Sequence, residues 1–214
     1  LILGLPSISQ SNWRHTLENV VRFPVQHISV YILTIYEGTK LQRMVERCDV
    51  SLPDDELLID MYEETVDYLE EHGFRQYEIS NFAKPGFESL HNQAYWNYES
   101  YRGFGVAASS FDGNVRSKNT SNLKEYLAGK RIEDQETLND KQKRLEELML
   151  GLRQSKGMGL HRVLYLIDGV DKEKTLKKLY ELKKQSLLCE SESSVFLTIR
   201  GMVLENEVIV RLLD

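Results

Sequence analysis

The chain has 214 residues, of which 28% are charged and 41% hydrophobic, and a formal net charge of −6. These values are typical of a globular protein with one large or two small domains, and the acidic balance argues against nucleic-acid binding as the main activity. No apolar run approaches the roughly 20 residues needed to cross a bilayer, and the two cysteines, Cys48 and Cys189, are too few for a disulfide scaffold or a cysteine-built metal site. We therefore expect a soluble protein of a reducing compartment, the cytoplasm.

The first half of the chain alternates apolar, β-branched runs with amphipathic segments. We predict strands over residues 1–3, 28–35 and 77–80, and a further strand within 102–111. Helices are predicted after the N-caps Ser11 and Asp54, and Gly73 is expected to end the second of them. This order of strands and helices with short connections predicts right-handed βαβ units on a parallel sheet. Ligands of such sheets bind beyond the carboxyl ends of the strands, where Thr34 and residues 80–82 are expected.

The second half is expected to hold a separate, smaller domain. Residues 113–140 are polar and lack a clear period, so we predict an irregular connection, with one short helical turn over 123–127, between a first domain, 1–112, and a second, 141–214. In the second domain we predict helices over 144–152, 161–166, 172–184 and 200–212, and a hairpin from 187–189 and 195–198. Helices followed by a short hairpin resemble a winged helix. The lysines of 172–184 have partners such as Glu173 and Glu181 on the same helix, and a single aromatic residue, Tyr180, does not form the interleaved pattern that stacks on bases, which favours a solvated face over a nucleic-acid surface.

Residues 77–112 gather many aromatic side chains around one histidine, with the hexapeptide His91-Asn92-Gln93-Ala94-Tyr95-Trp96 at their centre. A wall of aromatic rings suits a planar apolar ligand, and histidine is a common axial ligand of haem iron. The alternative is that the rings form core and that His91 is a structural polar residue. The residue chemistry alone leaves both interpretations open.

Five blocks of the sequence, in order, resemble the oxygen-independent coproporphyrinogen III oxidase family of radical SAM proteins. They are Leu1-Ile2-Leu3-Gly4-Leu5-Pro6, His27-Ile28-Ser29-x-Tyr31-x-Leu33-Thr34-Ile35-x-x-Gly38-Thr39, Tyr77-Glu78-Ile79-Ser80-Asn81-Phe82-Ala83-x-Pro85-Gly86, His91-Asn92-x-x-Tyr95-Trp96 and Glu147-Leu148-Met149-Leu150-Gly151-Leu152-Arg153. The third and fourth blocks are similar to the haem-chaperone branch of the family, the HemW-like proteins, rather than to the oxidases. The C-x-x-x-C-x-x-C cluster motif of the family does not occur in the sequence.

The resemblance implies an α/β fold that is the C-terminal part of a partial (β/α) radical SAM barrel, followed by a small winged-helix-like domain. It implies a chaperone that binds haem and delivers it to acceptor proteins, with transient association with a membrane or a membrane-bound acceptor and with no nucleic-acid partner. The alternative that it implies is an oxygen-independent coproporphyrinogen III oxidase of porphyrin biosynthesis.

The cofactors that the resemblance implies are S-adenosylmethionine, a [4Fe-4S] cluster and haem. His91 is then the candidate haem contact and iron ligand, with Tyr95 and Trp96 shaping the pocket, while Ile2 and Thr34 are expected near S-adenosylmethionine. Because the cluster motif is missing, we expect a cluster-binding portion ahead of these residues, and we do not expect the 214 residues to be catalytic alone.

Overall fold

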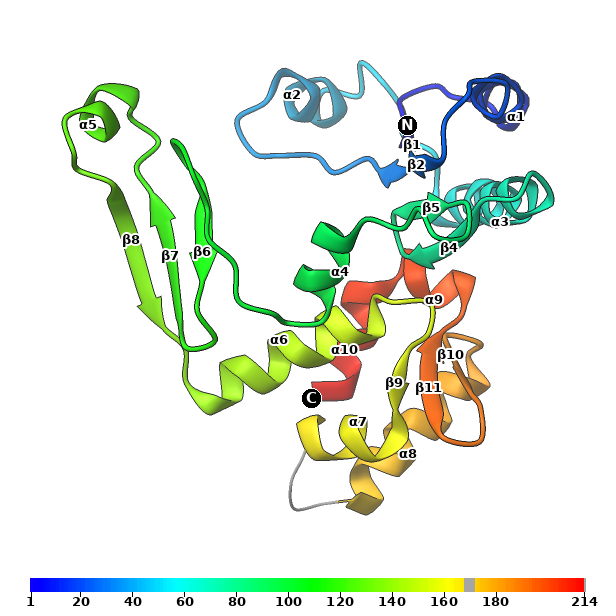
Figure 1. Ribbon diagram of the computed structural model, residues 1–214. Coiled ribbons are helices and arrows are strands. Elements are labelled where there is room, and N and C mark those ends of the chain that lie inside the picture. The colour runs from blue at the N-terminus through cyan, green and yellow to red at the C-terminus, as the bar shows by residue number, and fades with distance from the viewer. Residues whose placement is uncertain (168–171, 214) are drawn as a thin grey trace.

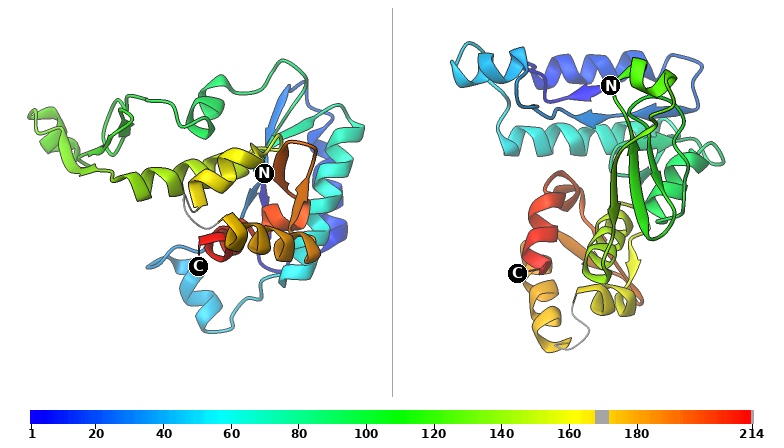
Figure 2. Two further views of the ribbon diagram at one scale, coloured as in Figure 1. Left: turned by 90° about the horizontal axis from the view of Figure 1, so that it is seen from below. Right: turned by 90° about the vertical axis from the view of Figure 1, so that its left-hand side faces the viewer.

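The structure, a computed structural model, describes residues 1–167 and 172–213 and has three parts (Figure 1). An N-terminal body holds the first five strands and first three helices. A three-stranded arm extends away from this body, as two further views confirm (Figure 2). A mainly helical C-terminal unit packs below the body in Figure 1. Helix α4 (Leu90–Trp96) lies between the body and the arm, and α6 (Asp140–Leu152) leads from the arm into the C-terminal unit.

The body contains two small sheets where the sequence predicts one parallel sheet. Its elements are β1 (Ile2–Leu3), α1 (Gln10–Val20), β2 (His27–Ser29), β3 (Tyr31–Ile32), α2 (Lys40–Glu46), α3 (Asp55–Glu71), β4 (Arg75–Glu78) and β5 (Asn81–Ala83). Strand β1 pairs in parallel with β3, which agrees with the prediction. Strands β2, β5 and β4 instead form an antiparallel sheet in that order, so the parallel prediction is wrong for them.

Two of the predicted strands are interrupted for a physical reason. The predicted strand 28–35 is divided at Val30, whose N–H donates to the carbonyl of Ser80 (2.7 Å) instead of continuing either ladder. The predicted strand 77–80 is the end of β4 followed by a reversal at Ile79 and Ser80, which starts β5. Continuous apolar runs mark burial on both faces but carry no signal for such a reversal.

The cap signals of the body are partly as predicted. The Asp54 side chain accepts from the N–H of Leu57 (2.9 Å) and begins α3, and Gly73 follows its end with a φ of +83°, so both predictions are confirmed. Helix α1 begins earlier than predicted, because Ser9 and not Ser11 accepts from the N–H of Asn12 (3.2 Å). Helix α2 is not predicted, since it buries no side chain and so has no apolar period.

Most of the arm occupies the segment for which an irregular connection is predicted, and its first strand lies within 102–111, where a strand is predicted. It consists of β6 (Ser109–Phe111), β7 (Val115–Asn119), α5 (Leu123–Leu127) and β8 (Ile132–Thr137). The strands form an antiparallel sheet in the order β6-β7-β8. Every residue of β8 is exposed, so the strand lacks the alternation of apolar and polar residues by which a strand is usually recognised. The predicted helical turn over 123–127 is confirmed as α5, whereas the prediction that the rest of 113–140 is irregular is wrong.

The C-terminal unit is close to the predicted order of elements. It contains α6, β9 (Met158–Gly159), α7 (Leu160–Ile167), α8 (Lys172–Lys184), β10 (Leu188–Glu190), β11 (Ser194–Leu197), α9 (Ile199–Val203) and α10 (Glu205–Leu213). The predicted hairpin is confirmed as β10 and β11, and β9 adds an unpredicted third strand beside β11. The predicted final helix is divided at Leu204 into α9 and α10. The likeness to a winged helix and the domain boundaries stay predictions.

Candidate functional site

Helix α4 carries the histidine-containing hexapeptide, between the body and the arm. The Ser89 side chain begins the helix by accepting from the N–H of Asn92 (3.2 Å), and the chain leaves it at Asn97 and Tyr98, where Tyr98 takes a φ of +60°. No residue of α4 is fully buried, and Leu90 is 81% exposed. The helix therefore presents its side chains to a surface and does not fill a core.

An edge-to-face series of rings begins at His91. The spacing of four residues places His91 and Tyr95 on one face of α4, with ring centroids 4.6 Å apart and planes at 74°. Tyr95 meets Tyr101 at 4.5 Å and 82°, and Tyr101 and Tyr98 lie 6.2 and 4.8 Å from Phe111. We call these five side chains the aromatic ladder. The first two contacts are edge-to-face, the favoured geometry of aromatic pairs, and the two with Phe111 are tilted, at 47° and 35°.

The prediction that His91 is a satisfied core residue does not agree with its surroundings. His91 is exposed, and within the described residues its imidazole nitrogens have no hydrogen-bond partner. By contrast, His27 Nε2 pairs with the Tyr77 hydroxyl (2.9 Å) and His72 Nδ1 with the Tyr68 carbonyl (2.7 Å). His91 is therefore oriented by the Tyr95 ring while its nitrogens stay available to a ligand.

Tyr95 and Trp96 contribute to one cavity of about 240 Å³, together with Tyr101, Phe111 and Arg116. His91 is not among the residues that line it, so the structure brings two of the three predicted pocket residues together and leaves the histidine on the outer face of α4. Trp96 faces inward: the guanidinium of Arg153 lies 4.8 Å from its ring centroid, and its buried indole nitrogen has no partner in the described part of the chain.

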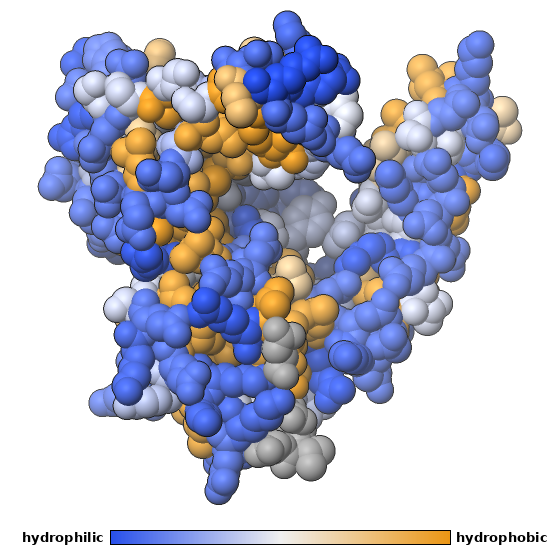
Figure 3. Space-filling view, turned by 180° about the vertical axis from the view of Figure 1, so that it is seen from behind, coloured by the Kyte–Doolittle hydropathy of each residue, from blue (hydrophilic) through white to orange (hydrophobic). Residues whose placement is uncertain are grey.

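Ile2 and Thr34 lie in the body and not on the aromatic ladder. Ile2 is paired with Tyr31 across β1 and β3, and the two side chains are 48% and 55% exposed. Thr34 follows the end of β3 and is also exposed. Thr34 therefore lies beyond the carboxyl end of β3, as predicted, whereas Ile2 begins β1; that both lie near S-adenosylmethionine stays a prediction. Viewed from behind, apolar side chains gather over this body (Figure 3).

A buried charged cluster, which the sequence analysis missed, joins α4 and the body to the C-terminal unit. Glu78 is fully buried, and one carboxylate oxygen accepts from the N–H of Ser80 (2.9 Å) and from the amide of Asn81. Its other oxygen accepts from Arg153 Nε (3.0 Å), while Arg153 Nη1 donates to Glu205 (3.0 Å). The same guanidinium covers Trp96, so this cluster supports one side of the candidate pocket.

The cluster leads to a prediction for the pH dependence of stability. Burial raises the pKa of Glu205, Arg153 lowers it by a smaller amount, and Glu78 raises it further. The folded protein then binds more protons than the unfolded chain between the ordinary glutamate pKa of about 4.3 and the raised value, so the free energy of unfolding falls as pH rises through this window. Urea denaturation from pH 4 upward should show the wild type losing stability relative to Glu205→Gln. Glu207→Gln, at an exposed glutamate of the same helix, is the control, and a difference independent of pH would contradict the prediction.

The described residues do not fit an iron–sulfur cluster. Such a cluster needs about four thiolates or similar ligands, whereas the two cysteines of the chain, Cys48 and Cys189, are free and exposed in separate parts of the fold. No group of three or more His, Cys, Asp or Glu side chains within residues 1–167 and 172–213 could hold a metal ion. In the same residues, no helix is long and apolar enough to cross a membrane. A single imidazole at the end of an aromatic wall does fit haem iron.

Comparison with known proteins gives relatives over nearly the whole chain. No family model matches it. It is 34% identical over 217 residues to the haem chaperone HemW of Bacillus subtilis, covering 97% of this chain and 56% of that protein. It is 31% identical to the haem chaperone HemW of Lactococcus lactis, covering all of this chain and 57% of that protein. The chain thus spans about half the length of the curated relatives it matches.

One solved structure shows the same fold. The coproporphyrinogen III oxidase HemN of Escherichia coli, described as a radical SAM enzyme, superposes with a TM-score of 0.71 over 99% of this chain and 53% of its own. The two sequences are 19% identical, so this likeness establishes a mixed α/β fold of the HemN type and nothing about activity.

Proposed function

We propose, from the premise that this chain is a HemW-like sequence of the radical SAM family over nearly its whole length, that its protein binds haem at the aromatic ladder and delivers it to acceptor proteins. The observation that supports the site most directly is the exposed imidazole of His91, which has no hydrogen-bond partner within the described residues and is held against Tyr95. A haem carrier must release its ligand, and an exposed site on a short helix suits transfer better than an enclosed pocket does.

The proposal assigns the radical SAM cofactors to other places. The ligands of a [4Fe-4S] cluster would lie outside these 214 residues, and S-adenosylmethionine would bind near the strand ends that carry Ile2 and Thr34. The protein would work in the cytoplasm, with acceptors that are soluble or membrane-bound. We place oxygen-independent coproporphyrinogen III oxidase second, because the relatives over nearly the whole chain are named haem chaperones and the oxidase shares only the fold.

A haem titration of the full-length protein, followed by Soret absorbance, tests the proposal. The wild type should show a saturable Soret shift, and His91→Ala should weaken binding about tenfold or more because the iron loses its nitrogen ligand. His161→Ala is the matched control: His161 is also exposed and lies on α7, away from the ladder. Equal affinity in the wild type and His91→Ala would place the ligand elsewhere. Absence of haem binding, with turnover of coproporphyrinogen III, would favour the oxidase.

A further inference from the structure

The aromatic ladder by itself lacks a free cation. Haem carries two propionate carboxylates, so a site for it needs groups that compensate negative charge as well as rings and an iron ligand. The two arginines in contact with the ladder or with Trp96 are already engaged: Arg116 donates to Glu146 at 2.6 Å, and Arg153 is held by Glu78 and Glu205. The cation must come from beyond these two residues.

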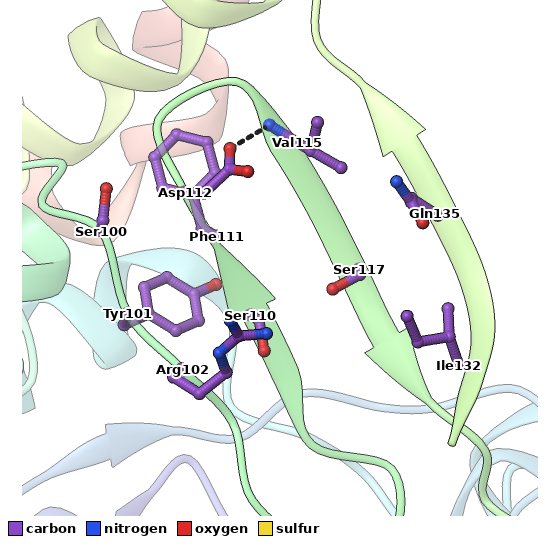
Figure 4. Close-up of a pocket in the computed structure, with 10 residues that line it drawn as sticks. All are labelled: Ser100, Tyr101, Arg102, Ser110, Phe111, Asp112, Val115, Ser117, Ile132 and Gln135. Carbon is purple, nitrogen blue, oxygen red and sulfur yellow. Dashed lines mark hydrogen bonds between the residues drawn. The ribbon is translucent and has the colours of Figure 1, made fainter. Parts of the chain in front are cut away.

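A groove of about 540 Å³ on the arm continues the ladder in the required direction (Figure 4). Tyr101 lines both this groove and the smaller cavity beside Tyr95, so it joins the two surfaces. Phe111, Val115 and Ile132 supply apolar contacts, and hydroxyl and amide groups from the three strands face the same space. A concave surface of this size with a few polar groups is typical of a small-molecule site.

Arg102 brings an uncommitted guanidinium to this groove. It follows Tyr101 directly, its side chain extends beside Ser110 in Figure 4, and within the described residues it makes no hydrogen bond or ion pair. The Asp112 carboxylate accepts from the N–H groups of Val115 (2.7 Å) and Asn114 (2.9 Å), which lower its pKa, and Arg102 contributes only a smaller electrostatic effect to that pKa. The fork of Arg102 is therefore free to bind a carboxylate in bidentate fashion.

We propose that Arg102 anchors a propionate carboxylate of the tetrapyrrole in this groove, with the macrocycle resting on Tyr101 of the aromatic ladder. This assignment rests on the proposed function, since it takes haem as the ligand, and it adds a second anchor on the arm to the one on α4. The ligand is then held from both sides of Tyr101, by iron coordination through His91 and by its carboxylate through Arg102. The arm thereby acquires a role in ligand selection: it distinguishes porphyrins with free carboxylates from neutral ones.

The test compares haem with haem dimethyl ester, in the same dilute detergent, on the full-length wild type, Arg102→Gln and Lys118→Gln. Lys118 is the matched control, because it is an exposed cation of β7 on the face of the arm sheet that is turned away from the groove. We expect the wild type to bind haem about tenfold more tightly than the ester, and Arg102→Gln to lose about tenfold for haem while its affinity for the ester stays unchanged. Lys118→Gln should bind both ligands as the wild type does.

The outcomes separate this assignment from the proposed function. If Arg102→Gln binds haem as well as the wild type, or weakens haem and ester equally, Arg102 is not a carboxylate anchor although the protein still binds haem. If the wild type itself binds neither ligand, the proposed function fails and this assignment fails with it. Arg102→Lys should recover only part of the selectivity, since an ammonium keeps the charge but not the bidentate geometry.

Discussion

Replacing Arg153 by alanine should lower the free energy of unfolding by about 3–5 kcal/mol. The substitution leaves the fully buried Glu78 carboxylate with its Ser80 and Asn81 donors but without a countercharge, and it leaves Glu205 close by with the same sign of charge. Removing one partner of a buried ion pair costs far more than the pair itself contributes, because the remaining charge is desolvated and uncompensated. Urea denaturation followed by circular dichroism measures the loss.

A double-mutant cycle identifies the source of that loss. In a Glu78→Gln background the effect of Arg153→Ala should be markedly smaller, because the fully buried anion is already gone and only Glu205 loses its partner. The control is Arg200→Ala, which removes an exposed ion pair with Glu56 and should change stability little. An equal effect of Arg153→Ala in both backgrounds would show that lost packing, not charge, is responsible. The fluorescence of Trp96, whose ring lies against the Arg153 guanidinium, is a second measure of the same loss of stability.

The parts of the fold that could be predicted are those whose signal is local. The long α3 has a cap at Asp54, a stop at Gly73 and an apolar stripe, and it was found almost to its ends. The antiparallel sheet of the body was missed, because the pairing of β2 with β5 joins residues more than fifty positions apart and depends on a reversal at Ile79 and Ser80. In the arm, β6 lies within the strand predicted in 102–111 and α5 matches the predicted helical turn, whereas β7 and β8 were missed; β8 is exposed along its whole length, so no period marks it.

The candidate site, like the fold, could be predicted only in part from the sequence. The chemistry of His91, Tyr95 and Trp96 could be recognised from a short motif, and their positions on one helix follow from it. The outward direction of His91 and the inward direction of Trp96 could not, because they depend on contacts with Tyr101 and Arg153 from distant segments. Glu78 looked like one carboxylate among many, and only folding reveals that it is buried against Arg153. A single carboxylate in a sequence indicates a role only once the residues that pair with it in the fold are known.

Replacing Trp13 by alanine should lower the free energy of unfolding by about 3–5 kcal/mol. Trp13 is 1% exposed and is among the largest fully buried side chains, so its removal leaves a cavity between α1 and α3. Its indole N–H also donates to the Thr65 hydroxyl (2.8 Å), which itself donates to the carbonyl of Met61 (2.7 Å). The variant thus loses both packing and one buried hydrogen bond. Urea denaturation measures the sum.

Trp13→Phe separates these two contributions, since it keeps much of the ring volume and removes only the donor, and it should cost roughly 1–3 kcal/mol. Phe23→Ala, at a side chain 62% exposed, is the control and should stay within about 0.5 kcal/mol of the wild type. In Trp13→Ala the remaining tryptophan of the chain is Trp96, so fluorescence then follows α4 alone while circular dichroism follows the whole fold. Coincident transitions would show that the body and the candidate site unfold together, as the shared Glu78–Arg153 cluster requires. A loss below about 1 kcal/mol would contradict the close packing of α1 on α3.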